Sequence, residues 1–188
     1  AAGQKASVQM TIYDIAGEAF DFASSDTQQQ QFRYCEGFLL VVDPTATPSY
    51  VSDTIANFIS SLDEVKGKRT TKAASVPVAV IITKSDLHKK EIGLPYIRAT
   101  YKPMTDSEVQ LSFEQHQNDI CRAFLYDHGY GNAINLIEAE FSNIRYFPVS
   151  AMGHTTEDGQ YEPWGVMEPV FWLMSSDNCP LRNFAQQQ

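Results

Sequence analysis

The sequence has few cysteines, few cations and no long apolar run, and each shortage excludes a class of protein. Its three cysteines, Cys35, Cys121 and Cys179, are odd in number and widely spaced, so they predict neither a disulfide framework nor a paired-cysteine metal site. Apolar runs such as Phe38–Val42 are far shorter than the roughly 20 residues that cross a bilayer. These absences favour a reducing, cytoplasmic setting.

The balance of charge argues against two further partners. Lysine and arginine number 14 against 23 acidic residues, which gives a formal net charge of −9. A surface this negative repels phosphate backbones and anionic lipids. We therefore expect no nucleic acid and no membrane partner. With 43% hydrophobic residues over 188 positions, the chain can form one globular domain with a substantial core.

Four short apolar segments are predicted to be strands. Residues 8–12 alternate apolar and polar side chains, which is typical of a half-buried strand. Phe38–Val42 and Val78–Ile82 are apolar without alternation, as in parallel strands covered on both faces, and we expect the first of them to be central. Residues 144–149 form the fourth predicted strand.

Helical periodicity fills the intervals between these strands. Helices are predicted around residues 51–62, over 106–128, from Asn132 to Phe141, and near the end of the chain, where Val166 and Val170 begin an apolar face. Strands that alternate with helices predict a three-layer α/β fold with a mostly parallel central sheet and helices on both faces. Residues 1–188 then form one domain, with a mobile polar segment at 24–31 and a tail at 176–188.

Three of the predicted strands end in short polar signatures. These are Asp14-Ile15-Ala16-Gly17-Glu18, Thr83-Lys84-Ser85-Asp86 and Ser150-Ala151-Met152. In this order they resemble the third, fourth and fifth motifs of Ras-like (TRAFAC-class) GTPases, over roughly residues 8 to 175. Each motif alone is weak evidence for this family, but the occurrence of all three in this order is specific for it.

The resemblance implies a Ras-like G domain of the P-loop NTPase class that binds GTP or GDP with Mg²⁺. A long helical insertion separates the second and third signatures. That insertion makes the chain more similar to prokaryotic domains of the double-GTPase type than to eukaryotic small G proteins.

The resemblance also implies a guanine site at two of the signatures. Guanine presents N1–H and N2–H₂ side by side, and the carboxylate of Asp86 would accept both hydrogen bonds. Lys84 would lay its aliphatic stem against the base, and the hydroxyl of Thr83 would brace the loop. Ser150 would orient Asp86.

Two neighbouring residues would complete that guanine site. The backbone N–H of Ala151 would donate to guanine O6. Met152 stands where the family often has lysine, and it would cover the base with a polarizable apolar side chain.

The first signature would contact the phosphates. Asp14 would hold Mg²⁺, usually through water, and the backbone N–H of Gly17 would bind the γ-phosphate. Glu18 stands where many relatives carry the glutamine that orients the attacking water, and an ionised carboxylate donates no hydrogen bond, so slow hydrolysis is expected. The alternative for Glu18, an exposed residue that opens a polar loop, is the stronger one.

The family's phosphate loop, GxxxxGK[ST], does not occur in these 188 residues. Gly67-Lys68-Arg69-Thr70 is a near match, but Leu62 stands where the first glycine is needed, so a solvated turn is expected there. In the Ras-like strand order the missing strand lies between residues 8–12 and Phe38–Val42. We therefore expect this sequence to be the later part of a longer protein; the alternative is a remnant whose sheet closes directly.

The four histidines, His88, His116, His128 and His154, show no metal-ligand spacing, so no metal cage is predicted from them.

Three hypotheses of function remain open. The first is a GTP/GDP switch whose hydrolysis depends on phosphate-loop residues outside this sequence and which signals to a protein effector or partner subunit. The second is a pseudo-GTPase that keeps the fold as a protein-interaction module. A flavodoxin-like or Rossmann-type binder is the third, and the absence of GxGxxG disfavours it.

Overall fold

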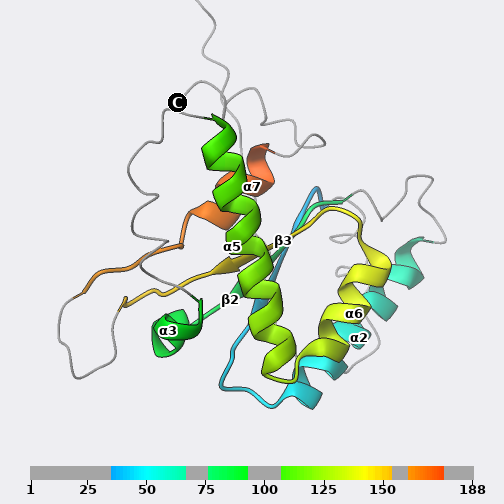
Figure 1. Ribbon diagram of the computed structural model, residues 1–188. Helices are drawn as coiled ribbons and strands as arrows, with labels where there is room; N and C mark the ends of the chain where they lie inside the picture. The colour runs from blue at the N-terminus through cyan, green and yellow to red at the C-terminus, as the bar shows by residue number, and fades with distance from the viewer. Residues whose placement is uncertain (1–34, 67–75, 93–106, 154–160, 176–188) are drawn as a thin grey trace, which may run out of the picture.

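The computed structural model describes residues 35–66, 76–92, 107–153 and 161–175 (Figure 1). The strand expected at residues 8–12, the polar segment 24–31 and the tail 176–188 lie outside these ranges, so these three remain predictions.

Three parallel strands form the described sheet, in the order β1-β2-β3. They are β1 (Phe38–Val42), β2 (Val78–Ile82) and β3 (Ile144–Pro148), and they pair in register from one end to the other. The parallel pairing confirms the expectation from the alternating elements. β2 is the central strand of the described sheet, whereas β1, which was expected to be central, lies at its edge.

Within the described ranges, five α-helices and one short 3₁₀ helix accompany the sheet. They are α2 (Pro48–Lys66), η3 (Ser85–His88), α3 (Lys89–Ile92), α5 (Ser107–Asp127), α6 (Gly131–Glu140) and α7 (Glu168–Ser175). The predicted helices are confirmed to within a few residues, except that the last one begins at Glu168. Val166 lies before it and is exposed, so its place on a helical face was predicted wrongly. Within the described residues, no helix is long and apolar enough to serve as a membrane span.

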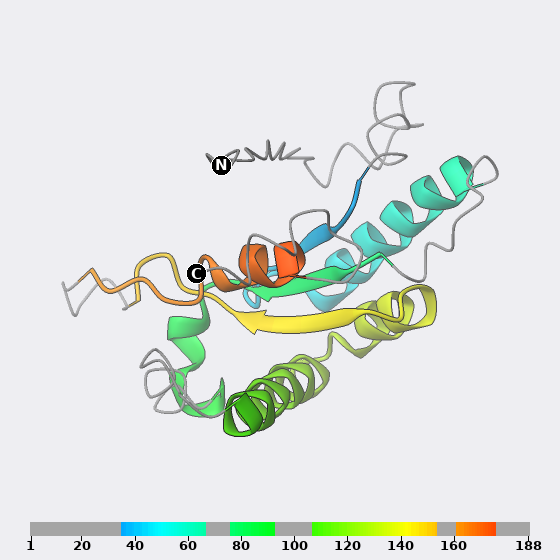
Figure 2. The same cartoon turned by 90° about the horizontal axis from the view of Figure 1, so that it is seen from above.

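Helices cover both faces of the sheet, as predicted. Figure 2 shows α5 and α6 on one side of the strands and α7 on the other. On the first face Phe38 packs edge-on against Phe58 of α2, with ring centroids 5.2 Å apart. On the second face Phe147 contacts Trp172 of α7 at 5.8 Å. This alternation follows from the period of two along each strand.

The two faces are not equally buried. Val78, Val80 and Ile82 of β2 belong to the main core, and Ala79 on the opposite face is also fully buried. On the edge strand β1, however, Val41 is 63% exposed. The unbroken apolar run predicted burial of both faces of β1, and at Val41 that prediction is wrong.

A polar network joins α5, α6 and β3 at the rim of the core. Arg122 donates two hydrogen bonds to the carboxylate of Glu138, at 2.6 and 2.8 Å, and the hydroxyl of Tyr146 donates a third at 2.9 Å. The hydrogen bond from Arg122 holds the pKa of Glu138 below its ordinary value, against the opposing effect of burial. The network therefore ties α5 and α6 to the middle of β3.

Candidate functional site

The loops that follow the three strands meet at the carboxyl edge of the sheet, where open α/β folds bind ligands. We call them the β1 loop (residues 43–47), the β2 loop (83–86) and the β3 loop (150–153). Because the strands are parallel and in register, these three loops are neighbours. The second and third contain two of the signatures identified in the sequence.

Asp86 and Ser150 are joined directly across this edge. The hydroxyl of Ser150 donates a 2.6 Å hydrogen bond to Oδ1 of Asp86, although 64 residues separate them in the sequence. The same hydroxyl oxygen accepts a 2.8 Å hydrogen bond from the backbone N–H of Gly153. The side chain of Asp86 therefore has a defined orientation, and its carboxylate keeps further acceptor positions for a ligand.

A second serine joins the ends of β2 and β3. Ser85 is fully buried, its hydroxyl donates to the carbonyl oxygen of Ile82 at 2.6 Å, and its oxygen accepts from the N–H of Val149 at 3.2 Å. The N–H of Ser85 in turn donates to the carbonyl oxygen of Val149. Ser85 and Ser150 are the buried polar residues of the described chain, and no buried side-chain polar atom there lacks a partner.

Thr83 and Lys84 connect the β2 loop to the β1 loop. The N–H and the hydroxyl of Thr83 both donate to the carbonyl oxygen of Val42, at 3.0 and 3.2 Å, so Thr83 braces the loop as expected. Lys84 has a left-handed backbone with φ 50°, which is uncommon for a residue other than glycine. Its ammonium binds Asp43 at 2.7 Å and the hydroxyl of Thr45 at 3.2 Å.

The carboxyl group of Asp43 is affected by two opposing influences. Partial burial raises its pKa, but the hydrogen bonds from Lys84 and Thr45 outweigh burial and hold the pKa below the ordinary value. Asp43 is therefore ionised at neutral pH and pairs with the ammonium of Lys84. Sequence reasoning did not single out Asp43, although its position directly after a buried strand was a usable signal.

Ala151 and Met152 lie exposed at the tip of the β3 loop. Met152 is 48% exposed, and its carbonyl oxygen accepts a 2.9 Å hydrogen bond from the N–H of Glu162. Its side chain is thus available to cover a flat ligand, whereas its backbone is fixed.

A later segment of the chain supports the β3 loop, and sequence reasoning missed it as a part of the site. Ser150 and Trp164 exchange two backbone hydrogen bonds of 3.0 Å in an isolated antiparallel bridge. Gly153 has φ +78°, and a Cβ there would lie 1.7 Å from the carbonyl oxygen of Glu162. Gly165, with φ +72°, would place a Cβ 2.2 Å from the carbonyl oxygen of Pro148. Glycine is needed at both positions because no side chain fits.

The phosphate-binding part of the predicted site cannot be placed in the same way. Asp14, Gly17 and Glu18 lie outside the described residues, as does the near match at residues 67–70. Their assignments remain predictions from the sequence.

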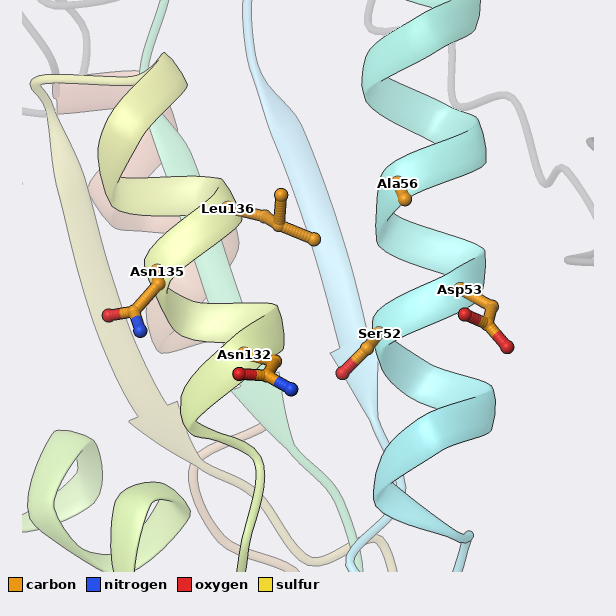
Figure 3. A pocket seen from close by; sticks show the side chains of 6 residues that line it. All are labelled: Ser52, Asp53, Ala56, Asn132, Asn135 and Leu136. Carbon is orange, nitrogen blue, oxygen red and sulfur yellow. The ribbon is translucent and has the colours of Figure 1, made fainter.

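A separate hollow of about 450 Å³ lies between α2 and α6 (Figure 3). Its lining combines polar and small apolar side chains: Ser52, Asp53, Ala56, Asn132, Asn135 and Leu136. None of these is a predicted site residue, and none belongs to the three loops. The hollow therefore does not compete with the carboxyl edge as the candidate site.

Cys121 is excluded as a nucleophile by its environment. It is fully buried, and burial raises the pKa of its thiol to about 12, so little thiolate exists at neutral pH.

Comparison with known proteins identifies the family of the chain. A search of curated proteins found no match, and neither did a search of solved structures. The family model Double-GTPase 2, by contrast, matches residues 2–157, which include all three signatures and most of the sequence. The chain therefore belongs to the Double-GTPase 2 family.

Proposed function

We propose that the protein is a guanine-nucleotide-binding domain that works as a GTP/GDP switch. Membership of its family implies nucleotide binding of the GTPase type. The observation that carries the more specific proposal is the 2.6 Å hydrogen bond between Ser150 and Asp86. It fixes one carboxylate where two strand-end loops meet, and a fixed carboxylate can accept both the N1–H and the N2–H₂ of guanine. Adenine lacks that pair of donors.

The neighbouring residues supply the rest of the proposed base site. The stem of Lys84 would lie along one face of the base, and the exposed side chain of Met152 would cover the other face. The N–H of Ala151 would donate to guanine O6. Thr83 supports this arrangement, because its two hydrogen bonds to the carbonyl oxygen of Val42 hold the β2 loop against the end of β1.

For the phosphates we propose the roles that the sequence suggested. Asp14 would hold Mg²⁺ through water, and the N–H of Gly17 would bind the γ-phosphate. Glu18 would stand beside the attacking water. Residues 1–188 would form a single Ras-like G domain that lacks its first strand and phosphate loop, and residues outside this sequence would supply both. Loss of the γ-phosphate would release the segment that includes residues 24–31 and change the surface offered to a protein effector or partner subunit.

One observation favours a second candidate, an interaction module that binds no nucleotide. GxxxxGK[ST] does not occur in these 188 residues, and it supplies the amides and the lysine that neutralise phosphates. The two candidates differ in a measurable property, which is guanine-specific affinity.

The deciding experiment is calorimetric titration with GDP and with a non-hydrolysable GTP analogue, both with Mg²⁺. The 188-residue chain and the full-length natural protein are titrated in parallel, and ATP is the control ligand. Guanine-specific binding by the full-length protein would support the switch. If neither protein bound either nucleotide, the interaction module would replace it.

Replacing Asp86 by asparagine tests the base site itself. The amide of Asp86→Asn donates where the carboxylate accepted, so we expect guanine affinity to fall by on the order of 2 to 4 kcal/mol, about 30- to 700-fold. Xanthine nucleotides should bind better to the variant than to the wild type, because xanthine has a carbonyl at position 2. Asp53→Asn, an exposed aspartate on α2, is the matched control. Unchanged GTP affinity in Asp86→Asn would refute the proposed site.

A further inference from the structure

Three potential metal ligands that are distant in the sequence meet beside the β2 loop. His88 ends η3, Glu91 lies in α3, and His128 directly follows α5. Nδ1 of His88 is 3.2 Å from Oε1 of Glu91, and Nε2 of His128 is 3.1 Å from Oε2 of the same carboxylate. The three ligand atoms all lie within 4.8 Å of one another. Sequence spacing predicted no metal cage, because the fold rather than the sequence brings His128 to the other two.

Aromatic packing holds both imidazole rings in place. The ring of Phe124 lies 4.9 Å from His88 and 4.0 Å from His128, measured between ring centroids, and the two imidazoles are 5.2 Å apart. The side chains of His88 and His128 are 20% and 31% exposed, whereas Glu91 is 52% exposed. The cluster thus has a packed inner side and one side open to water.

The hydrogen bonds of His128 indicate which of its nitrogens is available. Nδ1 lies 2.8 Å from the carbonyl oxygen of Phe124, which can only accept, so Nδ1 carries a hydrogen. The other ring nitrogen, Nε2, faces the carboxylate of Glu91. Nε2 is therefore the ring nitrogen that is placed to bind a metal ion. Metal-bound histidines commonly donate their other N–H to a backbone carbonyl, as His128 does.

We propose that His88, Glu91 and His128 bind a zinc ion, with water as the fourth ligand. Tetrahedral zinc with bonds of roughly 2.0 to 2.2 Å places neighbouring ligand atoms about 3.3 Å apart. Each imidazole nitrogen lies at a similar distance from one oxygen of Glu91, 3.2 Å from Oε1 and 3.1 Å from Oε2, so a small rotation of the carboxylate would let one oxygen serve as the third ligand. Two imidazoles and one carboxylate suit zinc, whereas Mg²⁺ and Ca²⁺ prefer oxygen ligands throughout.

The zinc ion would fasten η3 to the end of α5. His88 is two residues from Asp86, so the metal would restrain the same short helix that contains the proposed base-reading carboxylate. This site does not depend on nucleotide binding, and its test needs no nucleotide.

The test is a zinc titration of the full protein, free of nucleotide and Mg²⁺, in competition with a chromogenic chelator. Wild type should bind one zinc ion at this site. His128→Ala and Glu91→Gln should each weaken zinc binding by on the order of 100-fold or more, since loss of even an outer hydrogen-bond partner costs 10- to 100-fold. The matched control is His116→Ala, which removes an exposed imidazole from the same α5 helix and should leave affinity unchanged.

A second measurement separates ligand loss from misfolding. Zinc should raise the thermal unfolding temperature of wild type and of His116→Ala, because a ligand that binds only the folded state stabilises it. Glu91→Gln, which retains shape and hydrogen-bonding capacity, should fold normally and show no such rise. The proposal would be overturned if wild type bound no zinc, if Glu91→Gln bound it as tightly as wild type, or if His116→Ala weakened binding equally.

Discussion

The β1 loop and the pair formed by the β2 and β3 loops lie at the same edge of the sheet but are held by different interactions. The β2 and β3 loops are joined through Ser85 and Ser150, whose exposed fractions are 0% and 1%. The β1 loop is joined to the β2 loop by the ion pair of Lys84 and Asp43, whose side chains are 51% and 37% exposed, and the carbonyl oxygen of Ala46 in the β1 loop accepts a 2.7 Å hydrogen bond from the hydroxyl of Tyr130. The serine contacts are buried, whereas the contact between the side chains of Lys84 and Asp43 faces solvent.

The contrast has a consequence for ligand binding. Buried hydrogen bonds are costly to break, since each leaves an unpaired polar group, so the position of Asp86 is fixed before any ligand arrives. An exposed ion pair contributes about 0 to 1 kcal/mol, so Lys84 can exchange Asp43 for another partner at little cost. The β2 and β3 loops therefore provide a rigid recognition surface, and the ammonium of Lys84 provides an adaptable contact.

The largest effect is expected where the backbone of the β3 loop leaves no room. Gly153→Ala would place a methyl group 1.7 Å from a carbonyl oxygen at φ +78°, and should lower the free energy of unfolding by about 3 kcal/mol or more. The control is Gly129→Ala, whose φ is +87° but whose nearest contact is a proline side chain at 3.4 Å. This control variant should lose only about 1 to 2 kcal/mol of unfolding free energy. Equal losses in urea unfolding would show that the β3 loop is less rigid than described.

An intermediate effect on stability is expected when the buried hydroxyl of Ser150 is removed. Ser150→Ala deprives the N–H of Gly153 of its acceptor and Asp86 of its donor, and should cost about 1 to 3 kcal/mol in denaturant unfolding. Thr45→Ala removes an exposed hydroxyl from the β1 loop and should change stability by less than about 0.5 kcal/mol. If the two variants lost the same amount, the distinction between the loops would fail.

The smallest effect is expected at the exposed ion pair. Asp43→Asn should lower the free energy of unfolding by less than about 1 kcal/mol at pH 7. Since the folded-state pKa of Asp43 is depressed below 3.8, its contribution is present above that value and is lost as the pH falls through the folded pKa. Unfolding curves of wild type and variant should therefore converge in acid. If wild type remained more stable than Asp43→Asn at acidic pH, the stabilisation by Asp43 would not be electrostatic.

Much of the fold was predictable because its elements are encoded locally. The bounds of β1 and β2 match their apolar runs, and α5 differs by one residue at each end from the helix predicted at 106–128. The family was also predictable, since the order of three short signatures is a property of the sequence. The start of α7 was not predictable, because the bridge to Ser150 and the turn at Gly165 hold the preceding residues out of the helix.

Within the candidate site, the sequence identified residues but not all of their partners. It predicted the contact of Ser150 with Asp86, which is present at 2.6 Å. It missed the contact of Lys84 with Asp43, because surface side chains choose partners by proximity across the folded sheet. It also missed the support that Gly153 receives from the segment around Trp164. Contacts between distant segments leave no periodic signal in the sequence.

The sequence by itself determined the alternation of strands and helices, the polar signatures at the strand ends and the family, since these depend on local composition and order. The tertiary structure alone decided which polar groups are buried, which loop is fastened by an exposed ion pair, and that His88, Glu91 and His128 share one site. The physical reason is that burial, hydrogen-bond pairing and ligand geometry depend on distances between segments, and packing sets those distances only when the whole chain folds.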